Sequence, residues 1–408
     1  MKIIHTSDWH LNNVLGGRCP RNDDLQRALL QISRYLDEYT VDVMVVSGDL
    51  FRERSRPEQL QAGIKIMKDC FQPFVQRGGT ILAISGNHDS EIFFSTLRDA
   101  LDLLSPIEKQ DGISPSGRFY VTANATAVKL QSPDGEVVQF VLMPCPTPRY
   151  LRREESFRFQ NIEQRNQFVK SEFMNVLRAL QSRLDQRFPA ILMGHVTVTG
   201  TTASSGLHLD MSKEVVLEPS DLSFPWSYVA LGHQHQAKEA VSGIPHIRYA
   251  GSIDRLDHGE RDDEKSVVLL EIKDKQLVQA PKLLPLQSTS FCEVEINDPV
   301  KEIPELAERY PDAKQTLVRY ILHWDSSMHD REQLYRDLDV IFPRWYQRTS
   351  IDVRTGTITK AGLTFQQSSD VVGTARHYLQ DVLQNRNETE RSELLSLAEQ
   401  LFVEEGLA

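Results

Sequence analysis

Short apolar runs recur along the first 260 residues, and polar residues follow each of them. The runs lie at residues 3–4, 41–47, 80–85, 190–193 and 228–231. Nearly continuous apolar runs of this kind are typical of strands that are covered on both faces of a sheet. Glycine follows each of the last four runs, which lets the backbone turn tightly there. The sequence therefore predicts five buried strands that deliver polar residues to one edge.

Amphipathic segments separate these strands. Their apolar residues recur every three or four positions, which is the periodicity of a helix with one buried face. We expect helices near 22–36, 57–76, 91–104 and 155–187. We expect further strands near 119–130, 137–143, 246–252 and 265–272. Helices that alternate with strands predict an α/β layered fold.

The pattern changes near residue 285, where Pro281 and Pro285 precede a segment with its own alternation. There we expect strands at 291–296, 317–323 and 351–353 and helices at 303–309 and 331–341. The sequence thus predicts a large domain at 1–284, a small α/β domain at 285–360 and a helical tail at 361–408. The two short helices of the tail cannot bury both apolar faces alone. They fold back on the body or dock on a partner, and we favour the partner.

The polar residues at the strand exits include side chains that bind metal ions. Residues two apart in an extended chain point the same way, so Asp8 and His10 can hold one ion together. A single Asp-x-His pair is weak evidence, but similar residues follow the other four strands. They are Asp49, Asn87, His88, Asp89, His195, His233 and His235. This recurrence favours a metal site over a solvated loop.

The net charge bears on nucleic-acid binding. The chain of 408 residues has a formal net charge of −11, which argues against a surface that is basic overall. A local basic track remains open, because Arg52, Arg54 and Arg56 follow the second strand. More arginines lie between 149 and 165, where a solvated helix face is as good an explanation as DNA contact.

Membrane and disulfide-rich classes are disfavoured. No apolar run approaches the roughly 20 residues of a membrane helix, and no signal-peptide pattern precedes the first strand. The four cysteines form no Cys-x-x-Cys pair, so the sequence indicates neither a zinc ribbon nor a disulfide framework. We expect a soluble cytoplasmic protein with reduced thiols.

The order of the motifs resembles that of the calcineurin-like metallophosphoesterase superfamily: Asp-x-His, Gly-Asp, Gly-Asn-His-Asp, Gly-His and Gly-His-x-His. Within it, the opening Met-Lys-Ile-Ile-His-Thr-Ser-Asp-Trp-His-Leu, Gly-Asp-Leu-Phe, Gly-Asn-His-Asp-Ser and Tyr-Ala-Gly-Ser at 249–252 are similar to the SbcD family. That family comprises the Mre-type nuclease subunits of bacterial SbcCD complexes. The motifs cover residues 1 to about 260, and a set of five is highly specific.

The resemblance implies a four-layer metallophosphoesterase sandwich, with two central mixed sheets flanked by helices, a small α/β capping domain and a C-terminal helical tail. It implies a DNA nuclease with 3′-to-5′ exonuclease activity on double-stranded ends and endonuclease activity on single strands. Two divalent cations, manganese by preference, would serve this reaction. The implied ligands are Asp8, His10, Asp49 and His235 for one cation and Asn87, His195 and His233 for the other, with Asp49 as the bridge.

Further residues take roles from the same resemblance. His88 is assigned as the general acid or a phosphate contact, which suits imidazole near neutral pH, and Asp89 would orient it. Arg52 stands where many Mre-type relatives carry histidine; arginine can bind a phosphate but cannot shuttle a proton. His5 lies inside its strand, which is more typical of a core residue, or of one that supports a ligand, than of a ligand itself. Asp254, Asp257 and Glu260 can support a ligand, although a hydrogen-bonded turn explains them more simply.

The resemblance also implies partners and a location. These are DNA, an SbcC-like ATPase bound by the C-terminal helices, and a second copy paired through helices near 57–76 and 91–104, in a cytoplasmic protein associated with the nucleoid. One alternative is another metallophosphoesterase that acts on phosphoproteins or cyclic nucleotides. A scaffold with vestigial ligands is disfavoured, because no expected ligand is missing from the sequence.

Overall fold

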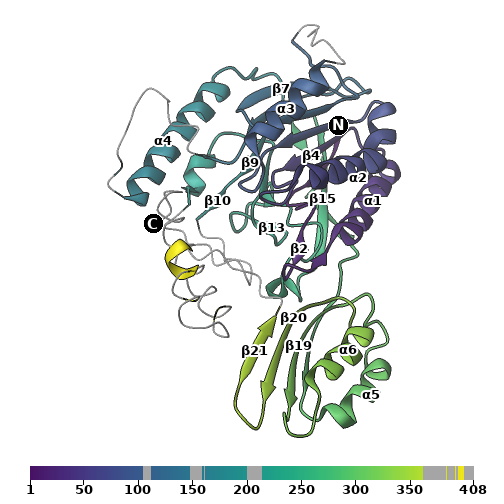
Figure 1. Cartoon of the computed structure of the whole chain (residues 1–408). Helices are drawn as coiled ribbons and strands as arrows, with labels where there is room; N and C mark the ends of the chain where they lie inside the picture. Colours follow the sequence, from purple (N-terminus) through teal and green to yellow (C-terminus); the bar gives the residue numbers. More distant parts are fainter. Residues whose placement is uncertain are drawn as a thin grey trace.

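Two large sheets form the body of the protein (Figure 1). The computed structural model describes residues 1–103, 112–147, 159, 161–199, 214–361, 383, 391 and 394–398. The first sheet has the strand order β16-β15-β1-β4-β5-β6, and β17 also pairs with β15. Its strands are β1 (Lys2–Thr6), β4 (Val43–Ser47), β5 (Thr80–Ile84), β6 (Phe119–Thr122), β15 (Lys265–Lys273), β16 (Gln276–Leu277) and β17 (Lys282–Leu286). Because β1, β4 and β5 run parallel, their carboxyl ends meet at one edge.

The second sheet carries the later motifs and has the strand order β13-β14-β12-β9-β8-β7. Its strands are β7 (Thr126–Gln131), β8 (Val137–Met143), β9 (Ala190–His195), β12 (Tyr228–Gly232), β13 (Lys238–Glu239) and β14 (Ile247–Tyr249). β12 is parallel to β9, and the register places Gly232 beside His195. Shorter elements are β2 (Val14–Leu15), β3 (Cys19–Pro20), β10 (Thr197–Val198), β11 (Val216–Leu217) and 3₁₀ helices at Pro219–Leu222 and His258–Glu260.

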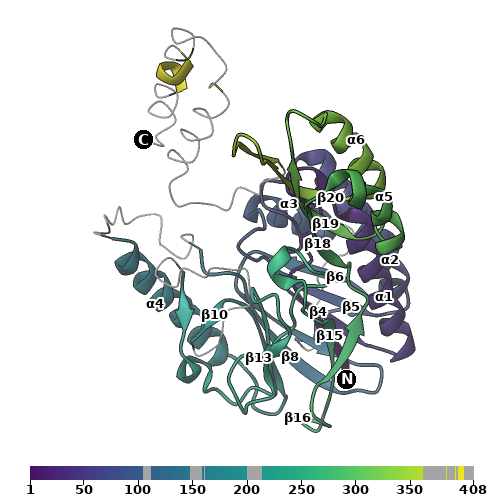
Figure 2. The ribbon, with the colours of Figure 1, turned by 90° about the horizontal axis from the view of Figure 1, so that it is seen from below.

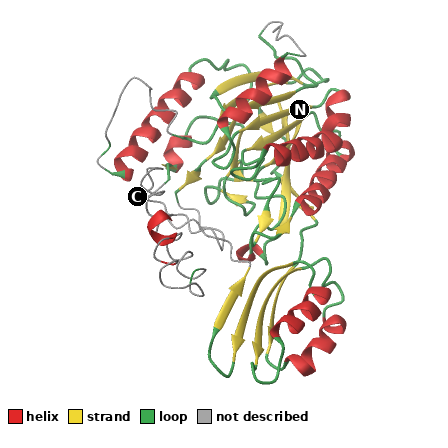
Figure 3. Cartoon of the chain, viewed as in Figure 1, coloured by secondary structure: helices red, strands yellow, loops and turns green. Residues whose placement is uncertain are grey.

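Alternate side chains of the first sheet face two different layers. Val43 and Val45 belong to the core between the sheets, whereas Met44 and Val46 pack with helices, as the two-residue repeat of a strand requires. The helices on this face are α1 (Asn22–Glu38), α2 (Pro57–Gln76) and α3 (Glu91–Asp102). α4 (Ile162–Gln181) packs on the outer face of the second sheet. Figures 2 and 3 show α4 on one side of the sheets and α1 and α2 on the other.

Residues 291–361 form a small unit with a core of its own (Figure 1). Its four strands have the order β18-β19-β20-β21, and two helices cover one face. These elements are β18 (Phe291–Ile296), α5 (Pro299–Arg309), β19 (Leu317–Trp324), α6 (Arg331–Ile341), β20 (Trp345–Asp352) and β21 (Ile358–Ala361). Val294, Tyr320 and Leu338 are buried between this sheet and its helices.

Charged and aromatic residues join the small unit to the body. The carboxylate of Asp24 on α1 accepts hydrogen bonds from Arg21 and from Arg344 of the small unit. The guanidinium carbon of Arg18 lies 3.8 Å from the ring centre of Trp345, and Arg18 donates a hydrogen bond of 2.8 Å to the carbonyl oxygen of that residue. Arg18 lies in the turn between β2 and β3. The contact between the two regions therefore combines these polar contacts with a small buried apolar cluster of Leu15, Cys19, Leu317 and Tyr346.

The structure confirms the predicted α/β class and a strand at each of the five apolar runs. The strand predicted at 119–130 is instead two strands in different sheets, β6 and β7, because the chain crosses between the sheets at 123–125. In the small unit, β20 begins at Trp345 rather than at 351, and β21 is absent from the predicted strands.

Parts of three predicted helical regions lie outside the described residues. They are residue 104 of the helix predicted at 91–104, residues 155–158 and 160 of the helix predicted at 155–187, and most of the tail predicted at 361–408. Within the part of the chain that the structure describes, no helix is long and apolar enough to cross a membrane.

Candidate metal centre

The candidate ligands come together because their strands end at the same side of the two sheets. The backbone N–H of Asp8 donates a hydrogen bond of 3.0 Å to the carbonyl oxygen of Gly48. The N–H of His10 donates one of 2.9 Å to the carbonyl oxygen of Asp49. These bonds hold the turns after β1 and β4 side by side. The first two motifs of the sequence therefore form one continuous surface.

Four of the candidate ligands have a left-handed backbone. Their φ angles are 51° at Asp8, 45° at His10, 53° at Asp49 and 92° at His233. Residues with a Cβ rarely adopt such angles, and backbone strain of this kind gathers at functional sites. The surrounding hydrogen bonds hold these turns in place.

Two glycines at the strand exits allow the ligands to approach one another. A Cβ on Gly86 would lie 2.1 Å from Oδ1 of Asp49, and a Cβ on Gly48 would lie 2.2 Å from Nδ1 of His195. Gly48 also has a φ of +95°, which favours glycine on its own account. A side chain at either position would push a candidate ligand out of place.

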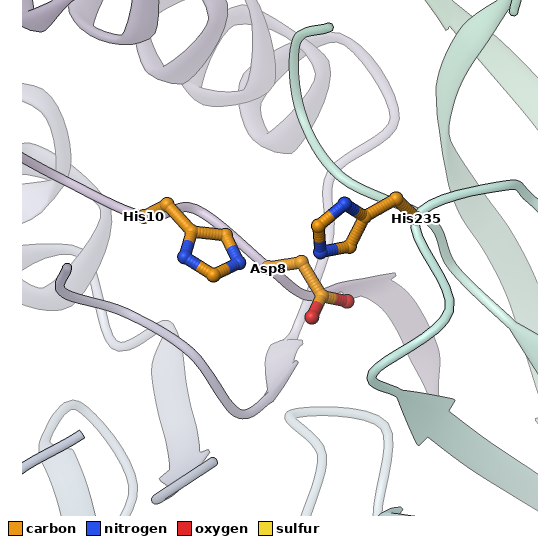
Figure 4. A group of neighbouring side chains, drawn as sticks. All are labelled: Asp8, His10 and His235. Carbon is orange, nitrogen blue, oxygen red and sulfur yellow. The ribbon is translucent and has the colours of Figure 1, made fainter. Parts of the chain in front are cut away.

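Asp8, His10 and His235 form the first group of candidate ligands (Figure 4). One ligand atom from each lies within 4.8 Å of the others, and all three residues are buried. Figure 4 shows the two imidazole rings on either side of the Asp8 carboxylate. Nε2 of His10 is buried and has no hydrogen-bond partner within the described part of the chain. A buried polar atom without a partner is costly, and a cation would supply one.

Asp8, Asp49 and His195 form the second group, whose ligand atoms also lie within 4.8 Å of one another. Oδ2 of Asp49 lies 3.4 Å from Nε2 of His195 and 3.5 Å from Nε2 of His10. The carboxylate of Asp49 therefore lies between the two groups, where a bridging ligand is expected. The two groups are candidate sites for two divalent cations.

Asn87 and His233 lie beside the second group. Oδ1 of Asn87 is 2.9 Å from Nε2 of His195 and 3.1 Å from Nδ1 of His233. The backbone N–H of His233 donates to both carboxylate oxygens of Asp8 at 3.1 Å. The structure thus brings together all seven side chains that the sequence analysis assigns to metal ions.

Buried polar residues next to the two groups form hydrogen bonds between the two sheets. Nδ1 of His195 lies 2.7 Å from the carbonyl oxygen of Ser47, which turns Nε2 toward the other candidate ligands. Ser47 Oγ donates a hydrogen bond of 3.0 Å to the carbonyl oxygen of Ala230 in the second sheet. His5 contacts Ser47 Oγ at 3.2 Å and Tyr228 Oη at 3.0 Å. His5 is therefore a buried core residue, as its position within β1 predicts.

Burial and mutual charge set the ionisation of the candidate ligands. Burial opposes the charge on Asp49, but His195 and His10 hold the pKa of this carboxyl well below its usual range. Burial disfavours the imidazolium form of His195, yet the charge of Asp49 raises the pKa of His195 to about 9. Burial raises the pKa of Asp8 and lowers the pKa of His10 well below its ordinary value. A cation would balance carboxylates that are crowded in this way.

His88 lies at the edge of the first group. Its ring centre is 5.1 Å from that of His10, and its backbone N–H donates a hydrogen bond of 2.9 Å to Oδ1 of Asp49. Nδ1 of His88 lies 3.9 Å from Oε2 of Glu53. The ring is thus next to the candidate ligands without belonging to either group.

The carboxylate of Asp89 contacts backbone groups. It accepts hydrogen bonds from the N–H groups of Gly86 (2.9 Å), Phe51 (2.9 Å) and Leu50 (3.1 Å). Burial raises the pKa of Asp89 to about 7, and the charge of Asp49 adds to this effect. Asp89 therefore ties two motif turns together. The carboxylate that faces the His88 ring belongs to Glu53, which the sequence analysis does not single out.

A cavity of about 970 Å³ opens beside the first group, between the body and the small unit. Its lining includes His10, His88 and His235 from the candidate centre, Arg52, Arg54 and Arg56 from the loop before α2, and Tyr346 and Gln347 from β20. Arg52 therefore lies beside the candidate centre, as its place after the second motif predicts. A smaller cavity of about 260 Å³ flanks the second group and includes Arg165. The other arginines between 149 and 158 lie outside the described residues.

Two glutamates contact the last two candidate ligands. Oε1 of Glu260 lies 2.7 Å from Nδ1 of His235, which favours a supporting role for Glu260 over a simple turn. Oε2 of Glu214 lies 3.0 Å from Nε2 of His233. Glu214 belongs to none of the sequence motifs, and only the fold brings it to the centre.

Comparisons with known proteins agree with this geometry. The family model for calcineurin-like phosphoesterases matches residues 1–237, which is more than half of the chain. The SbcD subunit of the SbcCD nuclease of Staphylococcus epidermidis is 26% identical over 312 residues, covering 74% of this chain and 75% of that protein. The corresponding SbcCD nuclease subunit of Escherichia coli strain K12 is 26% identical over 295 residues, covering 69% and 68%.

A third relative comes from Aeropyrum pernix. Its DNA double-strand break repair protein Mre11 is 24% identical over 303 residues, covering 73% of this chain and 64% of that protein. The family match includes the segments that carry the candidate ligands, since it extends from the first strand to His235 and beyond. This chain belongs to the calcineurin-like phosphoesterase family.

Proposed function

We propose that this protein is a two-metal-dependent DNA nuclease, with 3′-to-5′ exonuclease activity on double-stranded ends and endonuclease activity on single strands. Its similarity to proteins named as SbcCD nuclease subunits supports DNA as the substrate. The observation that carries the proposal is the convergence of carboxylate, amide and imidazole groups around Asp49, beside an arginine-lined cavity. Such ligands serve phosphodiester hydrolysis, and arginine recognises phosphate.

Two divalent cations fit the residues present. We assign Asp8, His10, Asp49 and His235 to one, and Asp49, Asn87, His195 and His233 to the other. Nε2 of His10, which has no hydrogen-bond partner among the described residues, and the readily ionised Asp49 support this assignment. Mixed imidazole and oxygen ligands suit manganese. When bound, the pair supplies a nucleophile at neutral pH and offsets the charge that develops on the phosphate.

His88 and Arg52 act on the substrate in this proposal. The side chain of His88 is 35% exposed and lines the larger cavity, so the ring can reach a bound phosphodiester. Nδ1 of His88 faces Glu53, and Nε2 gives a proton to the departing sugar oxygen. Arg52 binds a neighbouring phosphate as a permanently charged fork and takes no part in proton transfer.

We also propose the finer architecture and the partners. The layers of the body, residues 1–284, form a four-layer sandwich, and the domain at 285–360 caps the centre, with Tyr346 in the cavity wall limiting which DNA reaches the cations. The tail at 361–408 binds an SbcC-like ATPase. α2 and α3 pair with their copies in a homodimer, which the exposure of Ile92 and Leu103 supports. Such a protein works at the nucleoid in the cytoplasm.

The test compares substrates at a fixed manganese concentration. Purified protein is incubated with end-labelled duplex DNA, a single-stranded circle, a phosphopeptide, a cyclic nucleotide and a chromogenic phosphodiester. We expect both DNA substrates to be cut and all cleavage to stop when a chelator is added. Turnover of a phosphopeptide or cyclic nucleotide with intact DNA would contradict the proposal and favour another phosphoesterase.

The role of His88 has its own test. His88→Ala should slow DNA cleavage by about 10²–10⁴-fold, the usual contribution of a general acid, while the bound metal content stays unchanged. His323→Ala in the small unit is the matched control, because this histidine pairs with Glu295 on β18 and lines neither cavity. Unchanged cleavage by His88→Ala would remove His88 from the mechanism.

A further inference from the structure

Both histidines of the Gly232–His235 segment contact a glutamate from outside it. Glu260 lies at the end of a 3₁₀ helix that follows β14, and Glu214 lies just before β11. Glu260 contacts His235 at 2.7 Å, and Glu214 contacts His233 at 3.0 Å. Neither glutamate belongs to the two groups of candidate ligands. Each instead contacts a histidine that is itself a candidate ligand.

Glu260 belongs to a closed buried network. Its Oε2 accepts a hydrogen bond of 2.6 Å from Nζ of Lys265, and Lys265 also donates one of 2.9 Å to the carbonyl oxygen of His235. The N–H of Leu256 and Oγ of Ser252 contact the same carboxylate oxygen at 3.1 and 3.3 Å. The side chains of Glu260 and Lys265 are each 1% exposed. The network thus holds both the ring and the backbone of His235.

Glu214 has a more open setting. Its side chain is 33% exposed and lines the smaller cavity beside the second group. Oε2 of Glu214 also accepts a hydrogen bond of 3.1 Å from Oγ1 of Thr197 on β10. This second contact holds the carboxylate in place behind His233. A substitution at Glu214 disturbs less of the interior than one at Glu260.

The two glutamates contact different nitrogens of their histidine rings. Glu260 contacts Nδ1 of His235, which leaves Nε2 for the first group. Glu214 contacts Nε2 of His233, which leaves Nδ1 on the side of Asn87, 3.1 Å from its Oδ1. A carboxylate that accepts one ring N–H selects the neutral tautomer, so the other nitrogen becomes the ligand atom. In both histidines the geometry thus points the other nitrogen inward.

We propose that Glu260, together with Lys265, positions His235 for one divalent cation and that Glu214 positions His233 for the other. The inference rests on the two-cation assignment of the proposed function, but it does not depend on DNA as the substrate. Because each glutamate acts through one histidine, its removal weakens one cation site and spares the other.

Titration with manganese(II) tests this without any substrate. The free ion is followed by electron paramagnetic resonance as it is added to the full chain. Glu260→Gln and Glu214→Gln should each weaken one binding step by about 10–100-fold, the range for losing an outer partner of a metal ligand. Glu264→Gln is the matched control, since this exposed glutamate lies four residues beyond Glu260 and its substitution changes the charge equally. It should leave both steps unchanged.

Crossing these variants with histidine variants tests the route of the effect. In a His235→Ala background, Glu260→Gln should add no further loss, whereas in a His233→Ala background it should have its full effect. Glu214→Gln should show the reverse. Equal losses in both backgrounds overturn the proposal, and so does a loss no larger than that of Glu264→Gln.

Thermal unfolding of each variant without metal shows whether it has folded. If Glu260→Gln leaves Lys265 too poorly paired to fold, the more exposed Glu214→Gln decides the question alone. The outcome is also separable from the nuclease assay. If both glutamate variants bind manganese normally and the protein cuts DNA, only this inference is wrong. If each variant loses one manganese-binding step and the protein leaves DNA intact, only the proposed substrate is wrong.

Discussion

The body and the small unit build opposite walls of one cavity in different ways. On the body side, buried contacts such as that between His195 and Ser47 hold the candidate ligands against both sheets. On the other side, the small unit has its own core and meets the body through the Asp24–Arg344 ion pair and the stacking of Arg18 on Trp345. The ligand geometry is therefore set within the body. The position of the opposite wall depends in part on polar contacts that pH and salt can alter, beside the apolar cluster of Leu15, Cys19, Leu317 and Tyr346.

The largest expected effect comes from Asp49→Asn, at the centre of the body. Asparagine tolerates the left-handed backbone of this position but removes the charge that lies between the two groups. The rate of DNA hydrolysis should fall by more than about 100-fold, because about 100-fold is already the upper end of the loss when only a hydrogen-bond partner of a metal ligand is removed. Manganese affinity should fall at both steps. A variant that keeps both affinities would show that Asp49 does not bridge the sites.

Substitutions that create a cavity in either core should affect the two regions differently. Leu82 is buried between the large sheets and Leu322 in the small unit, and neither is exposed. Alanine at either position should cost about 2–5 kcal/mol of unfolding free energy in the unit that contains it. Leu82→Ala should also weaken manganese binding, whereas Leu322→Ala should not. Denaturant unfolding and manganese titration of both variants check this. An equal loss of manganese affinity in the two variants would show that the two cores do not differ in their effect on the centre.

Acid should loosen the contact between the regions. Burial opposes the charge on Asp24, but Arg344 and Arg21 hold its pKa below the ordinary carboxyl value. The folded pKa is thus depressed, so the stabilisation is complete above the unfolded pKa of about 3.9 and is lost as pH falls through the folded value. At pH 7, Asp24→Asn should cost about 1.5–3 kcal/mol, the range for hydrogen bonds to charged groups.

The measurement for Asp24 is a pair of unfolding curves across pH. The difference in stability between the wild type and Asp24→Asn should stay constant from pH 7 to about 5 and narrow below about 4. A difference that grows on acidification would mean that the carboxylate is not stabilised by its arginines. Asp23→Asn, on the same helix turn, serves as the control because, of these two neighbouring carboxylates, Asp24 makes the ion pair to Arg344 of the small unit.

The smallest expected effect concerns the cavity mouth. Arg52→Met should weaken DNA binding a few-fold and lower the slope of log affinity against log salt by about 1, the signature of one lost phosphate contact. Arg34→Met on α1 removes an exposed charge away from the larger cavity and should leave the slope unchanged. Equal slopes for the two variants would place DNA elsewhere.

Local sequence signals predict the parts of the site that depend on neighbouring residues. An apolar run, a glycine and a metal-binding side chain are consecutive in the chain, so the strand ends and candidate ligands such as Asp49 can be read directly. The same locality explains why His5 reads as a core residue. It lies before the strand exit, and the structure buries it.

Local sequence signals do not predict the features that depend on tertiary packing. Glu214 follows no apolar run and reaches His233 only because β11 lies beside β10. Asp89 follows His88 directly, which suggests a contact between their side chains, but the turn directs its carboxylate to backbone N–H groups. The division of 119–130 between two sheets is equally hidden, because both halves have strand-like composition.

The hairpin of β2 and β3 connects the two regions mechanically. It follows closely after His10, and Arg18 at its turn contacts Trp345 in the small unit. A few residues of backbone therefore join the contact with the small unit to a candidate ligand. An ion bound at the centre would respond to motion of the small unit on the far side of the cavity.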